Sequence, residues 1–142
     1  MRASTTYRIV AVLLVLHTAG HTIGFSHVDA AWGVDAPIAA LKSIHFTAGG
    51  TADRTYWGFY MGFGYFCSIL LSFSAVLAWQ LALLSPAKLR DLQFVSWAFA
   101  GAFVLATCVT WIYFFVAPVV FDSLIAVGLI AGAWRARTEG SG

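Results

Sequence analysis

Charged residues are scarce in this sequence. Only 10% of its 142 residues are Asp, Glu, Lys or Arg, whereas 61% are hydrophobic. An ordinary soluble domain carries about 25% charged residues. A water-soluble core of this length could not bury so much apolar surface, so lipid is the expected solvent for much of the chain. The formal net charge of +2 is too small to indicate a nucleic-acid partner.

Cysteine is nearly absent as well. The two cysteines, Cys67 and Cys108, each lie within an apolar run. They form neither a CxxC pair nor a Cys/His spacing typical of zinc sites. Two such residues also do not make the disulfide framework of a small secreted domain, so the sequence gives no support to that class of protein.

Four long apolar segments predict membrane-spanning helices, because a helix needs about 20 apolar residues to cross the hydrocarbon core. The segments cover about residues 7–25, 56–84, 92–116 and 118–134. The second is long enough to tilt, and the fourth is at the lower limit of length. The sequence therefore predicts an all-α fold, an integral membrane four-helix bundle that forms one domain over residues 1–142.

The basic residues predict the orientation of this bundle. With four spans, six of the eight Lys and Arg residues fall on one side, and only Lys42 and Arg54 lie opposite. The positive-inside rule then places both termini in the cytoplasm and the loop 26–55 outside a bacterial inner membrane. Alternatively, the first segment is a signal peptide whose cleavage would leave three spans.

The outer loop contains a predicted amphipathic helix at about residues 36–48. Asp35 is the expected N-cap, and Pro37 falls in the first turn, where proline is tolerated. Residues at three- and four-residue steps share one face: Ile38, Leu41, His45 and Ala48. We expect this helix to lie on the outer membrane surface, either as a cap on the bundle or without a functional role.

Two histidines lie within the first span, and one acid lies clearly within a span. His17 and His21 are four residues apart and share a helix face, whereas Asp122 lies about one turn into the fourth span. A charge at the bilayer centre costs about 2.5–3.5 kcal/mol on insertion scales, so such groups usually pair. We therefore expect Asp122 to approach at least one histidine. The alternative is that Asp122 caps its helix or contacts interfacial water.

Polar and ionisable side chains from all four spans converge on the outer half of the predicted bundle. This pattern predicts a pocket with His17, His21 and Asp122 as its ionisable residues. Its expected ligand-binding walls are aromatic: Tyr60, Tyr65 and Trp111. Such a pocket suits a lipophilic small molecule or cofactor, which the protein binds and, in an enzymatic version, transforms. Alternatively, the aromatic residues belong to the ordinary interfacial belt.

Other functions fit the same residues. His17, His21 and Asp122 are candidate ligands of a metal ion, although no Glu of the HExxH motif lies between the histidines. Haem bound by two histidines would need His27, His45 or a second copy of the chain. In a structural or accessory subunit, the histidines would only bridge helices. The sequence leaves these alternatives, the cofactor and the question of catalysis open.

Small residues mark the second span. Gly58 and Gly62 form a GxxxG element, which favours close helix packing. Because packing within the chain and packing between chains use the same pattern, a homodimer through this face remains one interpretation.

Two elements carry a resemblance. At HTAGHT (residues 17–22) and RTYWGFYMGFG (residues 54–64), the sequence resembles a group of small, uncharacterised bacterial multi-pass membrane proteins. The resemblance covers mainly the first two spans. It implies an integral membrane location and no particular activity. In that group the residue at the position of Gly58 is often acidic, whereas this chain has no carboxylate there. The resemblance emphasises six positions: His17, His21, Arg54, Tyr56, Trp57 and Tyr60.

Overall fold

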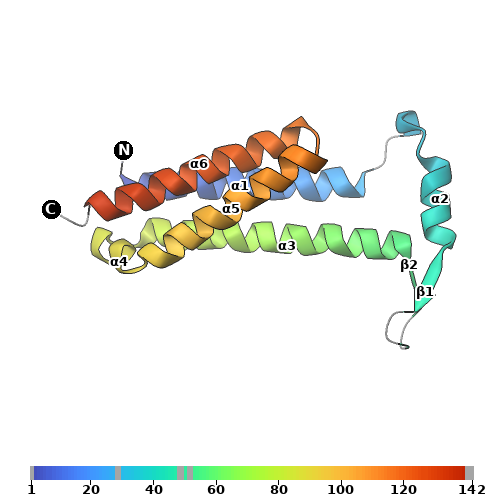
Figure 1. Cartoon of the computed structure of the whole chain (residues 1–142), viewed down its shortest axis with the longest axis horizontal. Helices are drawn as coiled ribbons and strands as arrows, with labels where there is room; N and C mark the ends of the chain where they lie inside the picture. The colour runs from blue at the N-terminus through green and yellow to red at the C-terminus, as the bar shows by residue number, and fades with distance from the viewer. Residues whose placement is uncertain (1, 28–29, 48–49, 51–52, 140–142) are drawn as a thin grey trace. The chain divides into compact units, whose positions relative to one another are not determined.

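The computed structural model describes residues 2–27, 30–47, 50 and 53–139. In this part of the chain, four helices are long and apolar enough to cross a membrane (Figure 1). They are α1 (Ala3–Ser26), α3 (Tyr56–Leu83), α5 (Gln93–Tyr113) and α6 (Val116–Glu139). The predicted all-α fold with four spans is confirmed. The chain is a small multi-pass integral membrane protein.

Shorter elements connect these helices. A 3-10 turn, η1 (Ala30–Trp32), and α2 (Asp35–Ser43) follow α1, and α4 (Pro86–Asp91) lies between α3 and α5. Two short strands, β1 (His45–Thr47) and β2 (Asp53–Thr55), pair antiparallel, with Phe46 opposite Arg54.

The predicted surface helix over residues 36–48 is too long. It ends at Ser43, because Ile44 adopts an extended backbone (φ −83°, ψ 113°) and leads His45 into β1. The residues Ile44-His45-Phe46-Thr47 are β-branched or aromatic, and such residues favour strands. Asp35 is the first helical residue rather than the N-cap, a position that Val34 occupies. The fourth residue of the predicted face, Ala48, lies outside the described residues.

Local chemistry also decides where α4 and α6 begin. Ser85 caps α4, since its hydroxyl accepts a hydrogen bond from the backbone N–H of Lys88, and Pro86 is the first helical residue. Pro118 is the third residue of α6, where a backbone N–H has no helical acceptor to lose. The fourth span therefore begins at Val116, ahead of the proline.

The chain forms two compact units, whose boundaries fall inside α1 and α3. The first unit lies within residues 1–17 and 71–142, and the second comprises residues 18–70. The second unit contains the end of α1, α2, the β1–β2 hairpin and the first half of α3.

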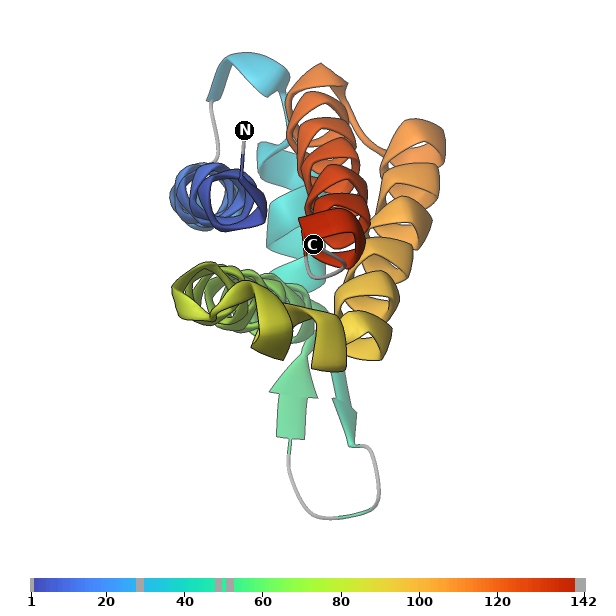
Figure 2. The ribbon, with the colours of Figure 1, turned by 90° about the vertical axis from the view of Figure 1, so that its left-hand side faces the viewer.

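In the first unit, α6 packs beside α5 and against the N-terminal part of α1 (Figure 2). Two glycines make the second contact close. A Cβ atom added at Gly128 would lie 2.6 Å from Val10 Cγ2, and one added at Gly132 would lie 3.0 Å from Tyr7 Cζ. The GxxxG pair that packs α1 on α6 is therefore on the fourth span. The prediction from the sequence concerned only the pair on the second span, Gly58 and Gly62.

The outer faces of the spanning helices carry large apolar side chains. Examples are Val12 (54% exposed), Phe73 (63%), Leu105 (69%) and Val127 (65%). Such a surface would be unfavourable in water, whereas in a bilayer these side chains contact lipid.

We expect the substitution Gly128→Ala to destabilise the protein, because its Cβ would meet Val10, whose β-branched side chain has little rotamer freedom. Overpacking of this kind costs about 1–3 kcal/mol. The matched control is Gly101→Ala on α5, where an added Cβ meets no described atom within 4 Å. Thermal unfolding in detergent should show a lower midpoint for the first variant only. Equal midpoints would contradict the close contact.

Candidate functional site

The row of buried side chains on α1 ends at His17. Tyr7, Val10 and Leu14 precede it at steps of three and four residues, and all three are fully buried. This spacing keeps them on one face of the helix. On α6, a matching buried row runs through Asp122, Ile125, Leu129, Gly132 and Ala136. The two rows place His17 and Asp122 at corresponding ends.

The register between the helices brings these two residues together. Tyr7 lies against Gly132 and Val10 against Gly128, so the helices run antiparallel. From Tyr7 to His17 the chain advances ten residues, as it does from Gly132 back to Asp122. Equal rise along both helices therefore places the imidazole opposite the carboxylate.

His17 and Asp122 form a buried pair. His17 Nδ1 lies 3.3 Å from Asp122 Oδ1, and the two side chains are only 10% and 5% exposed. The expected approach of Asp122 to a histidine is thus confirmed. Asp122 is the seventh residue of α6, so it does not cap that helix. The Nδ1 atom makes no hydrogen bond among the described residues, and proximity rather than a linear bond defines this pair.

The pair also has an aromatic neighbour. The ring of Phe121 stacks on the imidazole of His17, with centroids 5.2 Å apart and planes inclined by 25°. In a neutral imidazole, the carboxylate favours the tautomer that carries its proton on Nδ1. The other ring nitrogen, Nε2, is then a hydrogen-bond acceptor. The arrangement can orient the ring, and it can stabilise the positive charge if Nε2 takes up a proton.

In the second unit, His21 belongs to a different polar group. Its Nδ1 lies 3.1 Å from the hydroxyl oxygen of Ser68, and Thr22 Oγ1 lies 2.8 Å from the same oxygen. The Thr22 hydroxyl is also 2.8 Å from the carbonyl oxygen of Thr18. Ser68 is 8% exposed, so α3 supplies a buried hydroxyl that holds the end of α1 in place.

Phe25 extends this group with aromatic contacts. Its ring lies 5.2 Å from that of His21 and 5.1 Å from that of Tyr65, the second contact being edge-on. The ring also lies directly over Gly64, where a Cβ atom would have no room. Gly64 therefore allows α1 and α3 to approach closely within this unit.

The three aromatic residues expected to line a pocket are not buried. Tyr60 is 48% exposed, Tyr65 is 51% exposed and Trp111 is 68% exposed. Tyr60 contacts the ring of Trp57, and Tyr65 contacts Phe25. Their role as walls of a ligand pocket stays a prediction.

The histidines considered for haem lie in the loop that follows α1. His45 Nδ1 is 2.7 Å from Asp53 Oδ2, a contact that links β1 to β2 at an exposed site. His27 follows the last residue of α1 and is exposed. Within the ranges that the structure describes, no group of three His, Cys, Asp or Glu side chains could hold a metal ion.

Sequence reasoning missed a polar group at the other end of the first unit. Arg135 donates a hydrogen bond of 2.7 Å to the hydroxyl of Thr6, and the backbone N–H of Ala3 donates one of 2.9 Å to Glu139 Oε1. Gln93 Nε2 donates to the carbonyl oxygen of Ala133 at 2.9 Å. These contacts tie α1 and α5 to the end of α6. The sequence signal for this group is the pair of basic residues at the end of the fourth span, Arg135 and Arg137, which the prediction used only to orient the bundle in the membrane.

Comparisons with models of known protein families, with curated proteins and with solved structures give no match for this chain.

We expect His17 and Asp122 to be energetically coupled. Removing one member of a buried pair leaves an uncompensated polar group, which costs about 3–5 kcal/mol. Asp122→Ala should therefore lower the free energy of unfolding strongly, whereas His17→Ala with Asp122→Ala should cost much less than the sum of the single changes. Unfolding of the wild type, the two single variants and the double variant in mixed micelles gives the coupling energy of this double-mutant cycle. Additive effects would show that the pair is not coupled.

Proposed function

We propose that this small integral membrane protein binds a lipophilic small molecule through the His17–Asp122 pair. The single observation that supports the proposal is an imidazole 3.3 Å from a carboxylate, buried between two spanning helices. Ionisable groups are rare inside membrane spans, and they commonly mark a functional site. The class of guest is an apolar molecule with an oxygen-bearing head, such as a quinone, an isoprenoid alcohol or a lipid.

The chemistry of the pair suits that class. Asp122 faces Nδ1 of His17, so Nε2 is the nitrogen that remains to accept a hydrogen bond from a hydroxyl group. When the ring is protonated, the same nitrogen donates to a carbonyl oxygen. Either bond is stronger in hydrocarbon than in water, because water does not compete for the same groups. Phe121 supplies an apolar surface beside the imidazole.

Proton transfer is the step through which binding could become catalysis. An imidazole beside a carboxylate can accept a proton from a bound hydroxyl group, and the carboxylate stabilises the resulting imidazolium. The proposal does not depend on that step. It requires only that His17 contacts the oxygen of the guest.

A structural or accessory role is the second candidate, and one observation favours it. The His17–Asp122 contact joins the same two helices as the Thr6–Arg135 hydrogen bond and the Ala3–Glu139 hydrogen bond. Three polar links along one helix pair would also serve to hold α1 against α6 in a protein that binds no small molecule.

An apolar replacement of the pair separates the two candidates. In His17→Phe with Asp122→Leu, the aromatic ring keeps its stacking on Phe121, and replacing a buried ion pair by apolar residues is often neutral for stability. We expect this double variant to insert and unfold like the wild type but to lose the bound small molecule. Protein purified in mild detergent from its membrane extract is examined by native mass spectrometry, followed by solvent extraction of the retained compound.

The matched control is Ser96→Ala, a buried polar change on α5 at a side chain that is fully buried. This variant should retain the compound. Wild-type protein without any retained compound, or equal retention in the double variant, would refute binding at the pair. Lowered stability of the double variant with no compound in either protein would support the structural role.

A further inference from the structure

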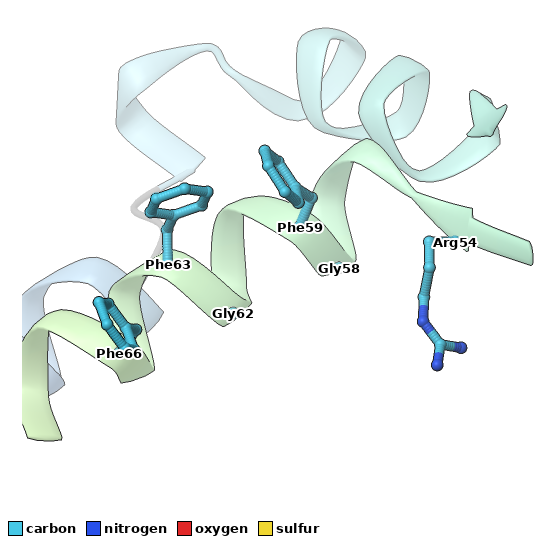
Figure 3. A pocket seen from close by; sticks show the side chains of 6 residues that line it. All are labelled: Arg54, Gly58, Phe59, Gly62, Phe63 and Phe66. Carbon is cyan, nitrogen blue, oxygen red and sulfur yellow. The ribbon is translucent and has the colours of Figure 1, made fainter. Parts of the chain in front are cut away.

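A groove runs along the first turns of α3 in the second unit (Figure 3). Its volume is about 420 Å³. Six residues line it: Arg54, Gly58, Phe59, Gly62, Phe63 and Phe66. The three phenylalanine rings follow one side of the helix, and the glycines leave the neighbouring strip without side chains. Arg54 stands at the end of the groove, with its guanidinium directed away from the rings.

The groove has a fixed wall. The ring of Phe59 packs edge-on against Phe63, with centroids 4.8 Å apart, and against Phe46 of β1 at 5.8 Å. At Gly62 the floor is open in the described part of the chain, because an added Cβ atom would meet nothing within 4 Å, whereas one added at Gly58 would lie 3.2 Å from Thr55 Oγ1. The GxxxG element noted in the sequence thus forms the floor of an open apolar channel.

The charge at the end of the groove is positive. Arg54 is exposed, and its Nη1 donates only a long hydrogen bond, 3.3 Å, to the backbone carbonyl of Asp53. The carboxylate of Asp53 is 2.7 Å from His45 instead. Among the residues that the structure describes, Arg54 therefore makes no ion pair. A guanidinium in this state can bind a phosphate group through two parallel hydrogen bonds.

The depth of these residues matches the layers of a bilayer. Arg54 precedes Tyr56, the first residue of the spanning helix, which places it at the level of the lipid headgroups. Gly62 lies about 9 Å beyond Tyr56 along the helix axis, at about 1.5 Å per residue, within the acyl-chain region. Charge and apolar surface thus follow each other in the order found in a phospholipid molecule.

We propose that this groove is a binding site for a glycerophospholipid with a net negative headgroup. The phosphate binds the guanidinium of Arg54, and one acyl chain lies over Gly58 and Gly62 beside the phenylalanine rings. This site is separate from the proposed function of the His17–Asp122 pair and does not depend on it.

A second copy of the chain fits the groove less well. In a two-fold dimer within a membrane, the two α3 helices would be parallel, so both Arg54 side chains would stand at the same depth beside the symmetry axis. Like charges that face each other in a desolvated interface oppose association. An anionic lipid neutralises the same charge.

The test is the affinity of the full-length protein for phosphatidylglycerol and phosphatidylcholine with identical acyl chains, titrated in detergent and counted by native mass spectrometry. Wild-type protein should bind the first phosphatidylglycerol molecule about fivefold more tightly than phosphatidylcholine, the effect of one basic residue near a membrane surface. Arg54→Gln should abolish this preference. Gly62→Leu should weaken the binding of both lipids, because its side chain fills the floor.

Two matched variants serve as controls. Lys42→Gln removes a charge from the same unit, but at an ammonium that lies 5.4 Å from the ring of Trp57 rather than in the groove. Gly101→Leu adds the same side chain to α5. Both should bind phosphatidylglycerol like the wild type. Equal losses in Arg54→Gln and Lys42→Gln would indicate general charge attraction and overturn the proposal. A dimer in the same spectra that Gly62→Leu converts to a monomer would assign the groove to a second copy.

Discussion

The close contact between α1 and α6 sets the register on which the candidate site depends. Gly128 and Gly132 admit Val10 and Tyr7 so closely that a Cβ atom at either position would force the neighbouring side chain to shift. Once these contacts fix the two helices lengthwise, the equal rise of both places His17 opposite Asp122. In hydrocarbon, water cannot form hydrogen bonds with an ionisable group. The position of His17 opposite Asp122 therefore determines whether both side chains can be buried in the membrane. Two glycines thus decide the surroundings of a carboxylate two to three turns away.

Sequence patterns predicted the parts of the fold that depend on composition. Apolar length alone located the four spans, because the bilayer imposes the same requirement on every helix. Features decided by local pairing were less accessible. The loop helix ends at Ser43 because β1 pairs with β2, and a helical periodicity that includes His45 cannot reveal a partner strand. The cap at Ser85 is a local signal that the sequence did contain.

The candidate site was predictable in its members but only partly in its arrangement. Asp122 needed a partner, and the first span offered two histidines. The choice of His17 follows from how α1 is rotated and shifted against α6, which depends on glycine contacts between segments distant in sequence. The partner of His21 was even less visible. In the sequence, Ser68 is one of several small residues on α3. Only its position opposite Thr22 and His21 in the structure shows that it is their hydrogen-bonding partner.

The connection between α5 and α6 has a consequence for how the protein enters the membrane. Only Phe114 and Phe115 separate Tyr113 from Val116, and both are exposed, at 54% and 73%. This joint has no charged or polar side chain to retain it in the aqueous phase, and it is too short to let one helix insert far ahead of the other. We therefore expect the two helices to insert into the membrane together, as one helical hairpin.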